Sequence, residues 1–506
     1  MKAIVATIAF LIMLTTPSEA THLKAADITF KRISQDFFTY EFTVTLYTDV
    51  QSPVRAGDGI INFGDGVEAQ LDINADSIED SEFVGFNGQV LIYKIKITHT
   101  YIVPGTYTIS YREPNRNNEI VNIDGGNSVL TGFYLQAFLV LDPSVGFNDS
   151  PLLNSFPIDR AFVGVKFTHN AWATDADGDS LSYRLVFPLQ DRELPARHYL
   201  LPDHDDFYSD FNTGNEANGG PPSFLLDPVT GDLVWDAPGD YLSNSVGPFS
   251  EYTVAYIVEE WRKVNSEWMR IGYVTRDMQI IVSGEKGGRP DFELPDHAQI
   301  ALGITIDQDI DFSNFQDEDI KVSFFGEPFQ LQNDAMTATP DFPAFESAPV
   351  ALNLQWSPGA QDLRDRPYLV HLKVESTGSD TEPPAVTYGT WVLSVEPLKT
   401  VVPPGISMPP TSTVVTGVID LPEASFESFT FYPNPTGQWL FWKNNNDQRE
   451  VFEEITIFNS LGKQTKRTKT ASNTITGIVV AELPPGLYFI SLKSKTARYR
   501  GTFIKN

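Results

Sequence analysis

The feature that most restricts how this 506-residue chain can fold is an alternation of apolar and polar side chains with a period of two. Residues 40–47, Tyr-Glu-Phe-Thr-Val-Thr-Leu-Tyr, are typical, and similar runs recur along the sequence. Such alternation places successive side chains on opposite faces of a strand. The i, i+3, i+4 spacing of an amphipathic helix is not sustained after the N-terminus, and the 35 Gly and 35 Pro suit a turn-rich protein. The predicted fold class is all-β.

The length predicts about three or four domains, at roughly 100–200 residues each. Residues 21–147 are predicted to form a first β-domain, with strands at 26–32, 38–48, 59–63, 90–98, 105–111 and 129–141. Residues 148–285 and 286–395 are predicted to form two related β-sandwiches in tandem, because an Asp-rich entry to a strand and a later Trp-containing strand occur in both. In the first of these, strands at 252–262 and 268–282 are expected to form a long hairpin with its turn at 263–266.

The N-terminus has the pattern of a secretory signal peptide over residues 1–20. Lys2 supplies a positive charge, residues 3–14 are apolar but too few to span a bilayer, and Ser18 and Ala20 are small residues at the positions that a cleavage site requires. A retained membrane anchor is the alternative. No later stretch approaches 18 apolar residues, so no transmembrane segment is expected after removal of the signal.

The C-terminal end differs from the rest in composition and charge. Residues 396–426 are rich in Pro and Thr and are interpreted as an extended linker. Residues 427–506 then hold 11 Lys+Arg and 6 Asp+Glu, whereas the preceding 426 residues hold 25 and 60. The net charge of −30 argues against a nucleic-acid partner, because phosphate binding needs concentrated Lys and Arg. The absence of Cys excludes thiol nucleophiles, Cys-ligated metals and disulfides.

An alternating acidic cluster is the best candidate for metal chemistry. Asp175, Asp177 and Asp179 lie in the sequence Asp-Ala-Asp-Gly-Asp, and alternate carboxylates on a tight turn can surround a hard cation such as calcium. The cluster is not an EF-hand, because Val186 stands where that loop requires Glu. The alternative, an acidic turn held open by hydration, remains open. Calcium in place of disulfides would rigidify an exported body.

Other polar groups favour structural roles over chemistry. Asp65 is interpreted as a turn cap and His99 as a structural residue. His204 lies within Asp-His-Asp-Asp, whose composition would suit a metal-binding loop. A solvated acidic loop is the favoured interpretation of this segment. Trp261 and Trp268 flank the expected hairpin turn, where they can stack on sugars or pack within the sheet. No catalytic fingerprint occurs, so no catalytic residue is assigned and the chain is not expected to be an enzyme. The long segment 190–222 is the predicted recognition surface.

Three segments resemble known families. Residues 61–66, Ile-Asn-Phe-Gly-Asp-Gly, followed by His-Thr-Tyr and Pro-Gly-Thr-Tyr within residues 99–109, resemble the non-catalytic PKD-type β-sandwich. The acidic cluster with the following Ser-Leu-Ser-Tyr-Arg-Leu resembles cadherin-like, Ig-like bacterial sandwiches, which often bind calcium at domain junctions. That resemblance implies Asp175, Asp177 and Asp179 as ligands, with Asn148 and Asp149 contributing from the linker. Thr21–Ile28 and residues 258–262 and 276–280 are similar to surface proteins of gliding Bacteroidetes, which implies adhesion at most.

The C-terminal module resembles the type A sorting domain of the type IX secretion system of Bacteroidetes. The residues that carry this resemblance are Tyr432, Pro433, Asn434, Pro435, Gly462, Gly486, Tyr488 and Lys505. The resemblance implies handling of residues 427–506 by the secretion machinery, and a mature protein that is extracellular or on the outer-membrane surface of a Gram-negative bacterium. The hypothesis is an adhesin-like binding protein with a glycan or surface-protein ligand. The alternatives are a secreted hydrolase, acting on polysaccharide through residues 190–222, and a structural spacer that binds nothing.

Overall fold

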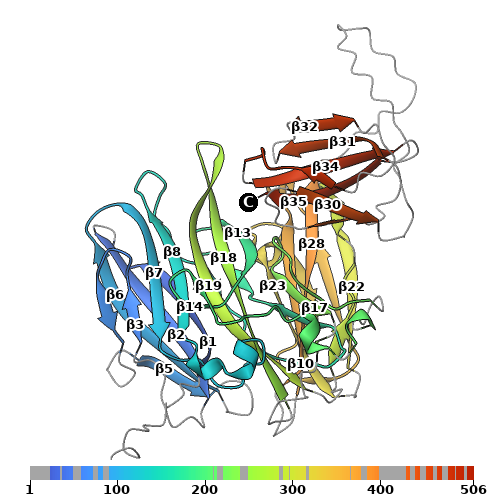
Figure 1. Cartoon of the computed structure of the whole chain (residues 1–506). Helices are drawn as coiled ribbons and strands as arrows, with labels where there is room; N and C mark the ends of the chain where they lie inside the picture. The colour runs from blue at the N-terminus through green and yellow to red at the C-terminus, as the bar shows by residue number, and fades with distance from the viewer. Residues whose placement is uncertain are drawn as a thin grey trace, which may run out of the picture. The chain divides into compact units, whose positions relative to one another are not determined.

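The structure is a computed structural model (Figure 1). It describes residues 23–34, 37–49, 59–71, 78–83, 90–208, 210–213, 220–236, 238–239, 249–283, 289–295, 297–314, 318–364, 366–377, 384–397, 429–432, 439–444, 452–459, 464–469, 477–484, 486–494 and 498–505. Within these residues the regular structure is strands joined by turns and short 3-10 helices, with no α-helix. The chain is therefore all-β, as predicted. The predicted signal peptide and most of the predicted linker lie outside the described residues.

The chain divides into two compact units, residues 1–401 and residues 402–506. We call the first unit the body. The division falls inside the predicted linker 396–426, so the basic residues 427–506 belong entirely to the second unit. In the part of the chain that the structure describes, no helix is apolar and long enough to cross a membrane.

The largest sheet contains fourteen of the described strands and joins the predicted first and second domains. Its main path runs β4-β3-β7-β8-β19-β1-β2-β6-β5, and β10, β13, β14, β15 and β18 pair at its sides. The bounds are β1 (Leu23–Arg32), β2 (Phe38–Asp49), β3 (Ile60–Asn62), β4 (Glu68–Gln70), β5 (Ile78–Phe83), β6 (Val90–Tyr101), β7 (Gly105–Glu113), β8 (Phe133–Leu141), β10 (Ile158–Phe162), β13 (Ser180–Val186), β14 (Leu189–Asp191), β15 (Leu194–Pro195), β18 (Phe249–Val264) and β19 (Glu267–Ser283).

Strand β19 joins the two halves of this sheet, because it pairs with both β8 and β1. The halves contribute to one core, in which the rings of Phe42 on β2 and Phe63 after β3 lie 5.3 Å apart. The predicted boundary at residues 147/148 therefore separates two segments that share a sheet, and the division into domains stays a prediction. The predicted hairpin is present, with its turn at Asn265 and Ser266, both of which have a positive φ (Figure 1).

The middle segment completes its sandwich with two small sheets, β11-β17-β16 and β12-β9. Their strands are β9 (Leu152–Leu153), β11 (Phe167–Asn170), β12 (Ala173–Thr174), β16 (Ser223–Leu226) and β17 (Asp232–Asp236). The buried ring of Trp235 on β17 packs edge-on against Tyr252 of β18, at 4.9 Å between centroids. The core thus lies between the three-stranded sheet and the long hairpin, and it places the end of β18 beside the turn that precedes β13.

The third segment is a separate two-sheet sandwich. One sheet has the order β20-β22-β26-β24 and the other β21-β28-β27-β23-β25. Their bounds are β20 (Pro290–Phe292), β21 (Ala298–Ala301), β22 (Ile306–Asn314), β23 (Asp319–Gly326), β24 (Thr337–Thr339), β25 (Glu346–Ser347), β26 (Val350–Trp356), β27 (Tyr368–Ser376) and β28 (Val386–Glu396). Side chains of both sheets, such as Trp356 and Trp391, share one core, and each is almost fully buried.

Direct hydrogen bonds join the third sandwich to the middle segment. The backbone N–H of Tyr388 donates to Thr168 Oγ1 at 2.9 Å, and Thr390 Oγ1 donates to Asp232 Oδ1 at 2.8 Å. Thr390 Oγ1 also lies 2.9 Å from Nδ1 of the buried His371. Hydrogen bonds between buried groups of this kind are costly to leave unmade, so they hold the two sandwiches together without any disulfide.

The C-terminal unit is a small sandwich of its own, with sheets β29-β30-β33 and β32-β31-β34-β35. The bounds are β29 (Phe429–Tyr432), β30 (Trp439–Asn444), β31 (Phe452–Asn459), β32 (Gln464–Lys469), β33 (Gly477–Val479), β34 (Gly486–Ser494) and β35 (Arg498–Lys505). Buried residues of both sheets, including Leu440, Ile457 and Leu492, form its core. Alternating apolar positions in short strands predicted this module.

Candidate functional site

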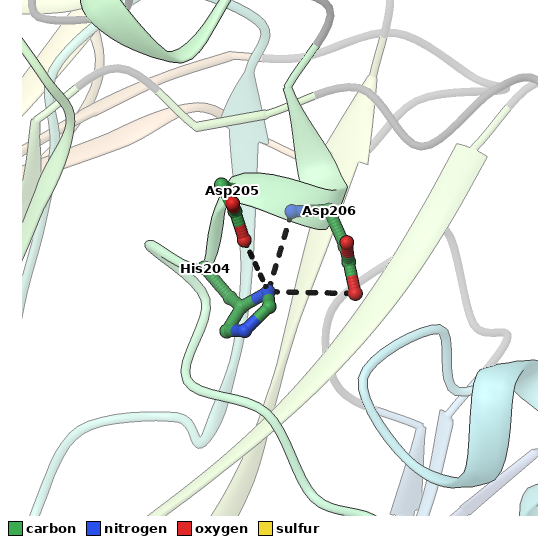
Figure 2. A group of neighbouring side chains, drawn as sticks. All are labelled: His204, Asp205 and Asp206. Carbon is green, nitrogen blue, oxygen red and sulfur yellow. Dashed lines mark hydrogen bonds and ion pairs between the residues drawn. The ribbon is translucent and has the colours of Figure 1, made fainter.

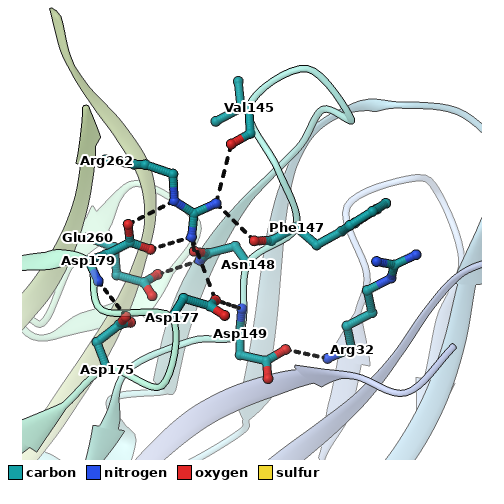
Figure 3. Close-up of polar contacts among 10 residues, drawn as sticks. All are labelled: Arg32, Val145, Phe147, Asn148, Asp149, Asp175, Asp177, Asp179, Glu260 and Arg262. Atoms are coloured by element: carbon teal, nitrogen blue, oxygen red, sulfur yellow. Dashed lines mark hydrogen bonds and ion pairs between the residues drawn. The ribbon is translucent and has the colours of Figure 1, made fainter. Parts of the chain in front are cut away.

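The structure brings together the acidic residues that the sequence singles out, at one end of the middle segment (Figure 3). Asp175, Asp177 and Asp179 lie on the turn between β12 and β13. The backbone N–H of Asp149 donates to Asp177 Oδ2 at 2.7 Å, so the segment after β8 is tied to this turn. Asp149 Oδ1 in turn accepts from the backbone N–H of Arg32 at the end of β1, at 2.7 Å.

A guanidinium group lies among these residues. Arg262, near the end of β18, donates from Nε and Nη2 to the two carboxylate oxygens of Asp179, the first at 2.8 Å and the second at 2.5 Å. Its Nη2 also donates to Asn148 Oδ1 at 3.1 Å and lies 3.6 Å from Asp177 Oδ2. Three of the five predicted calcium ligands therefore face Arg262, whose positive charge offsets those of Asp177 and Asp179. The calcium prediction for the set stays a prediction.

Glu260 belongs to the same cluster, and sequence reasoning missed it. Its side chain is fully buried, its Oε2 accepts from Asn148 Nδ2 at 2.8 Å, and its Oε1 has no hydrogen-bond donor among the described residues. Asp175 is arranged in the same way. Its Oδ1 accepts from the backbone N–H of Asp179 at 2.7 Å, and no donor in the described part of the chain reaches its buried Oδ2, which leaves the Glu260 carboxyl as its neighbour.

Asp175, Asp179 and Glu260 each have one carboxylate oxygen within 4.8 Å of the others, and both oxygens of Asp179 also accept hydrogen bonds from Arg262. Burial raises the pKa of Glu260 well above its ordinary value, and the neighbouring Asp175 raises it further. Burial also raises the pKa of Asp175. Facing carboxylates at this distance cannot both remain charged unless something positive lies between them. The gap therefore suits a shared proton or a cation.

A glycine on the neighbouring strand makes room for the Glu260 carboxylate. Gly272 on β19 is the register partner of Glu260. A Cβ atom at Gly272 would lie 2.0 Å from Glu260 Oε2 and 2.9 Å from Asn148 Nδ2. The absence of a side chain at residue 272 is thus a condition for the position of the Glu260 carboxylate.

A signal for Glu260 was present in the sequence. Tyr252, Val254, Tyr256 and Val258 are the core-facing residues of β18, and Glu260 continues the same period of two. The preceding Glu259 faces the other way, where its Oε1 accepts from Arg270 Nη1 at 2.8 Å. A carboxylate in phase with an apolar face needs a partner within the core, whereas Glu259, which is also buried, has an arginine partner on the opposite face.

The second predicted acidic loop contains a more local arrangement (Figure 2). His204 precedes the short 3-10 helix η4 (Asp205–Phe207), and its Nδ1 accepts from the backbone N–H of Asp206 at 3.3 Å. The same nitrogen lies 3.0 Å from Asp205 Oδ1 and 3.5 Å from Asp206 Oδ2. Both carboxylates are exposed, and all three residues come from one turn. This geometry is a helix cap with surface charges, in line with the solvated-loop interpretation.

The two groups assigned structural roles behave as predicted. Asp65 Oδ1 accepts from the backbone N–H of Val67 at 3.0 Å, which caps the turn after β3. His99 Nε2 lies 2.7 Å from Asp65 Oδ2, and its ring stacks on Phe63 with centroids 4.2 Å apart. Neither residue joins the acidic cluster. Trp268 at the hairpin turn is more than half exposed, whereas Trp261 is partly buried and donates from Nε1 to Ser182 Oγ at 2.9 Å.

A polar pocket of about 540 Å³ lies on the outer face of β3 and β7. Thr106, Thr108 and Ser110 contribute alternate side chains of β7 to its lining, and Asp191 and Arg192 reach it from the β14–β15 hairpin. A neighbouring hollow of about 470 Å³ shares Asp191 and adds Leu194 of that hairpin. The beginning of the predicted recognition segment 190–222 thus borders both.

The predicted sorting motif is described in part. Pro433, Asn434, Pro435 and Gly462 lie outside the described residues. Tyr432 ends β29, Gly486 begins β34 and Lys505, which is mostly buried, ends β35. Tyr488 is buried, its hydroxyl donates to the carbonyl of Pro484 at 2.9 Å, and its ring stacks on Phe503 at 5.5 Å. Tyr488 therefore has a packing role in the module.

Residues 430–506 match the family model described as "Secretion system C-terminal sorting domain". The chain carries a sorting domain. This match confirms the resemblance to the type IX secretion module and indicates export to the cell surface or secretion. The sorting domain covers the basic C-terminal unit, so the separate charge of that unit belongs to a part with its own function.

Comparison of whole chains adds little about the body. No curated protein matches the chain significantly. Similar solved structures include titin domains A168–A170, at 10% identity over 69% of this chain and 96% of that chain with a TM-score of 0.15. The tandem Ig repeats of Dlar match at 11% identity over 49% and 98%, with a TM-score of 0.20. The N-terminal four Ig domains of Dscam1 isoform 4.44 match at 9% over 87% and 91%, with a TM-score of 0.17. Superpositions this loose support no argument, and the β-sandwich description rests on strand pairing.

Proposed function

We propose that the body is an adhesin-like binding module that the sorting domain delivers to the cell surface or the medium, and that its ligand is a neutral glycan. The observation that carries the proposal is the polar pocket on β3 and β7. Its hydroxyl side chains, Thr106, Thr108 and Ser110, stand in a row along one strand. Hydroxyls both donate and accept hydrogen bonds, which suits the alternating donors and acceptors of a sugar.

The charges around the pocket favour a neutral ligand over an acidic one. Arg112 and Glu68 both line it, and their side chains lie 3.6 Å apart while about half exposed. Asp191 and Arg192 add one charge of each sign from the hairpin. A local balance of this kind, on a chain whose first 426 residues hold 60 Asp+Glu and 25 Lys+Arg, disfavours polyanionic partners.

An array of neutral and acidic oligosaccharides, probed with the purified full chain, tests this function. We expect binding to a subset of neutral glycans and at least a tenfold loss of affinity in Arg112→Gln. Arg184→Gln is the matched control, because Arg184 is also a half-exposed arginine, 3.5 Å from its carboxylate partner Glu259. That control should bind normally.

The alternatives give different results in the same experiment. Turnover of a bound glycan, lost when Asp191 is changed to Asn, would replace the binding module with a hydrolase that uses the segment 190–222. A folded chain that binds no glycan, or that binds equally well after Arg112→Gln, would contradict the proposal and favour a structural spacer or a surface-protein ligand.

A further inference from the structure

We infer that the gap between Asp175 and Glu260 is a binding site for one hard divalent cation, calcium or magnesium. The site is independent of the glycan pocket and of the proposed function. It also differs from the five-residue ligand set predicted from the sequence, because its central ligand is the buried Glu260. Asp175 Oδ2 and Glu260 Oε1 have no hydrogen-bond donor among the described residues, and the two carboxyl groups lie within hydrogen-bond reach of each other.

Each of the two carboxylates is already oriented by a hydrogen bond to its other oxygen. The backbone N–H of Asp179 holds Asp175 Oδ1 at 2.7 Å, and Asn148 Nδ2 holds Glu260 Oε2 at 2.8 Å. One oxygen of each group therefore remains directed into the gap, as Figure 3 shows. Carboxylates that ligate a metal are typically fixed through their second oxygen in this manner.

The spacing of these oxygens allows them to share one cation. Calcium–oxygen bonds measure about 2.3–2.6 Å, so oxygens that share one ion lie at most roughly 4.6–5.2 Å apart. The offered oxygens of Asp175, Asp179 and Glu260 all lie within 4.8 Å of one another. Magnesium, with bonds of about 2.0–2.1 Å, requires its ligand oxygens to lie within roughly 4.2 Å of one another.

Glu260 does not belong to the acidic turn, because it lies on β18 and its side chain is buried. Exposed acidic turns are common without any metal, but a fully buried carboxylate oxygen without a hydrogen-bond partner is not. Gly272 provides the room that this carboxylate takes up, since a Cβ there would lie 2.0 Å from Oε2. Arg262 offsets the charge of Asp179 and Asp177 on the other side of the turn, so the uncompensated charge is confined to the Asp175–Glu260 gap.

Isothermal titration calorimetry tests the inference. The full chain is first stripped of metal with chelator and is then titrated with calcium or with magnesium in separate runs. We expect one saturable site for at least one of the two ions in the wild type. Glu260→Gln and Asp175→Asn keep the shape of each side chain and should weaken that binding at least tenfold. Asp309→Asn is the control, because Asp309 lies in an exposed acidic stretch of β22 and should leave the site unchanged.

A variant that fails to fold is recognised by its far-ultraviolet circular dichroism, and Gly272→Ala then provides a second approach to the same carboxylate. That variant keeps every acidic group but displaces Glu260, and it should lose the saturable site. No saturable binding in the wild type, or equal binding in the wild type and Glu260→Gln, would overturn the inference and leave a shared proton in the gap.

Discussion

Two clusters of charge that lie along β19 are stabilised in opposite ways. Asp27 on β1 and Arg276 on β19 are register partners, both are almost fully buried, and their side chains are 3.1 Å apart. About four residues before Arg276 along the same strand, the space left by Gly272 is filled by Glu260, which faces Asp175. The first cluster joins opposite charges, whereas the second joins like charges.

The difference shows which charged groups have a partner of opposite sign within the chain and which do not. Arg276 also donates from Nη1 to the carbonyl of Ser155 at 2.8 Å, so its charge is both paired and hydrogen-bonded. Next to it, Arg116 Nη2 donates to Asp277 Oδ2 at 2.6 Å, and this pair is equally buried. Each carboxylate in these two pairs already has an arginine partner, so neither pair needs a bound ion to balance its charge. The facing carboxylates of Asp175 and Glu260 have no such arginine, so they need a shared proton or a bound cation, and we propose the cation.

The largest effect is expected from breaking the ion pair between Asp27 and Arg276. Arg276→Met leaves Asp27 buried without its partner, and we expect the free energy of unfolding to fall by about 3–5 kcal/mol. Denaturant unfolding of the full chain, followed by circular dichroism, measures the change. The double variant Asp27→Asn/Arg276→Met removes both charges and should recover most of the loss. If the double variant is no more stable than the single one, the pairing of these charges is not what stabilises the strand contact.

A buried ionisable group can also avoid the cost of burial by remaining neutral, and His371 in the third sandwich is such a case. Burial lowers its pKa to about 4. Because the unfolded chain binds the proton below about pH 6.5 and the folded chain does not, stability is fully present above that pH. It is lost as the pH falls toward 4, by up to about 3 kcal/mol.

Thermal unfolding of the wild type and of His371→Gln, compared between pH 7 and pH 4, isolates this contribution. The glutamine variant retains a side chain that can hydrogen-bond Thr390 but does not titrate, so its stability should fall less over the acidic range. Parallel pH profiles for the two proteins would show that His371 takes up a proton in the folded state.

A smaller effect is expected from filling the space beside Glu260. Gly272→Ala forces the Glu260 carboxylate to move, and overpacking at such a site costs about 2 kcal/mol. Gly220→Ala is the control, because a Cβ there meets nothing within 4 Å. Denaturant unfolding of both variants gives the comparison. An equal and negligible effect at the two positions would mean that Glu260 adjusts freely and that the gap is not a fixed feature.

The smallest effect has the opposite sign. In chelator, Glu260→Gln removes one of two facing carboxylates, and we expect it to stabilise the chain by about 1 kcal/mol, because a buried carboxylate oxygen without a donor is costly. Added calcium should reverse the order, because only the wild type retains the full site. Melting temperatures of both proteins with and without calcium check this. A variant that is less stable than the wild type in chelator would indicate a favourable shared proton.

The strands of the body could be predicted from sequence because their signal is local. The alternation in residues 40–47 follows directly from the pleat of β2, and the hairpin of β18 and β19 was predicted from two such runs and a short turn. The pairing of β19 with β1 could not be predicted, because about 250 residues separate Asp27 from Arg276 and periodicity does not identify a partner strand. The continuous sheet between the first two segments was missed for this reason.

In the candidate site too, residues that are close in the sequence could be predicted, whereas residues far apart in the sequence could not. Asp175, Asp177 and Asp179 were identified because they are neighbours in the sequence, and Asn148 and Asp149 were added by resemblance. Glu260 and Arg262 come from a strand about 80 residues later, and only the register of β13 against β18 brings them to the turn. That register decides which carboxylates face a guanidinium and which face each other.

The most direct test of the contrast between the two clusters is the location of a bound cation. Crystals of the full chain grown with terbium, a stand-in for calcium with a strong anomalous signal, would show it. We expect a single anomalous peak within about 2.6 Å of both Asp175 Oδ2 and Glu260 Oε1, and none at Arg276. A gap without a peak, with the two carboxyl groups joined by a direct hydrogen bond, would contradict this expectation.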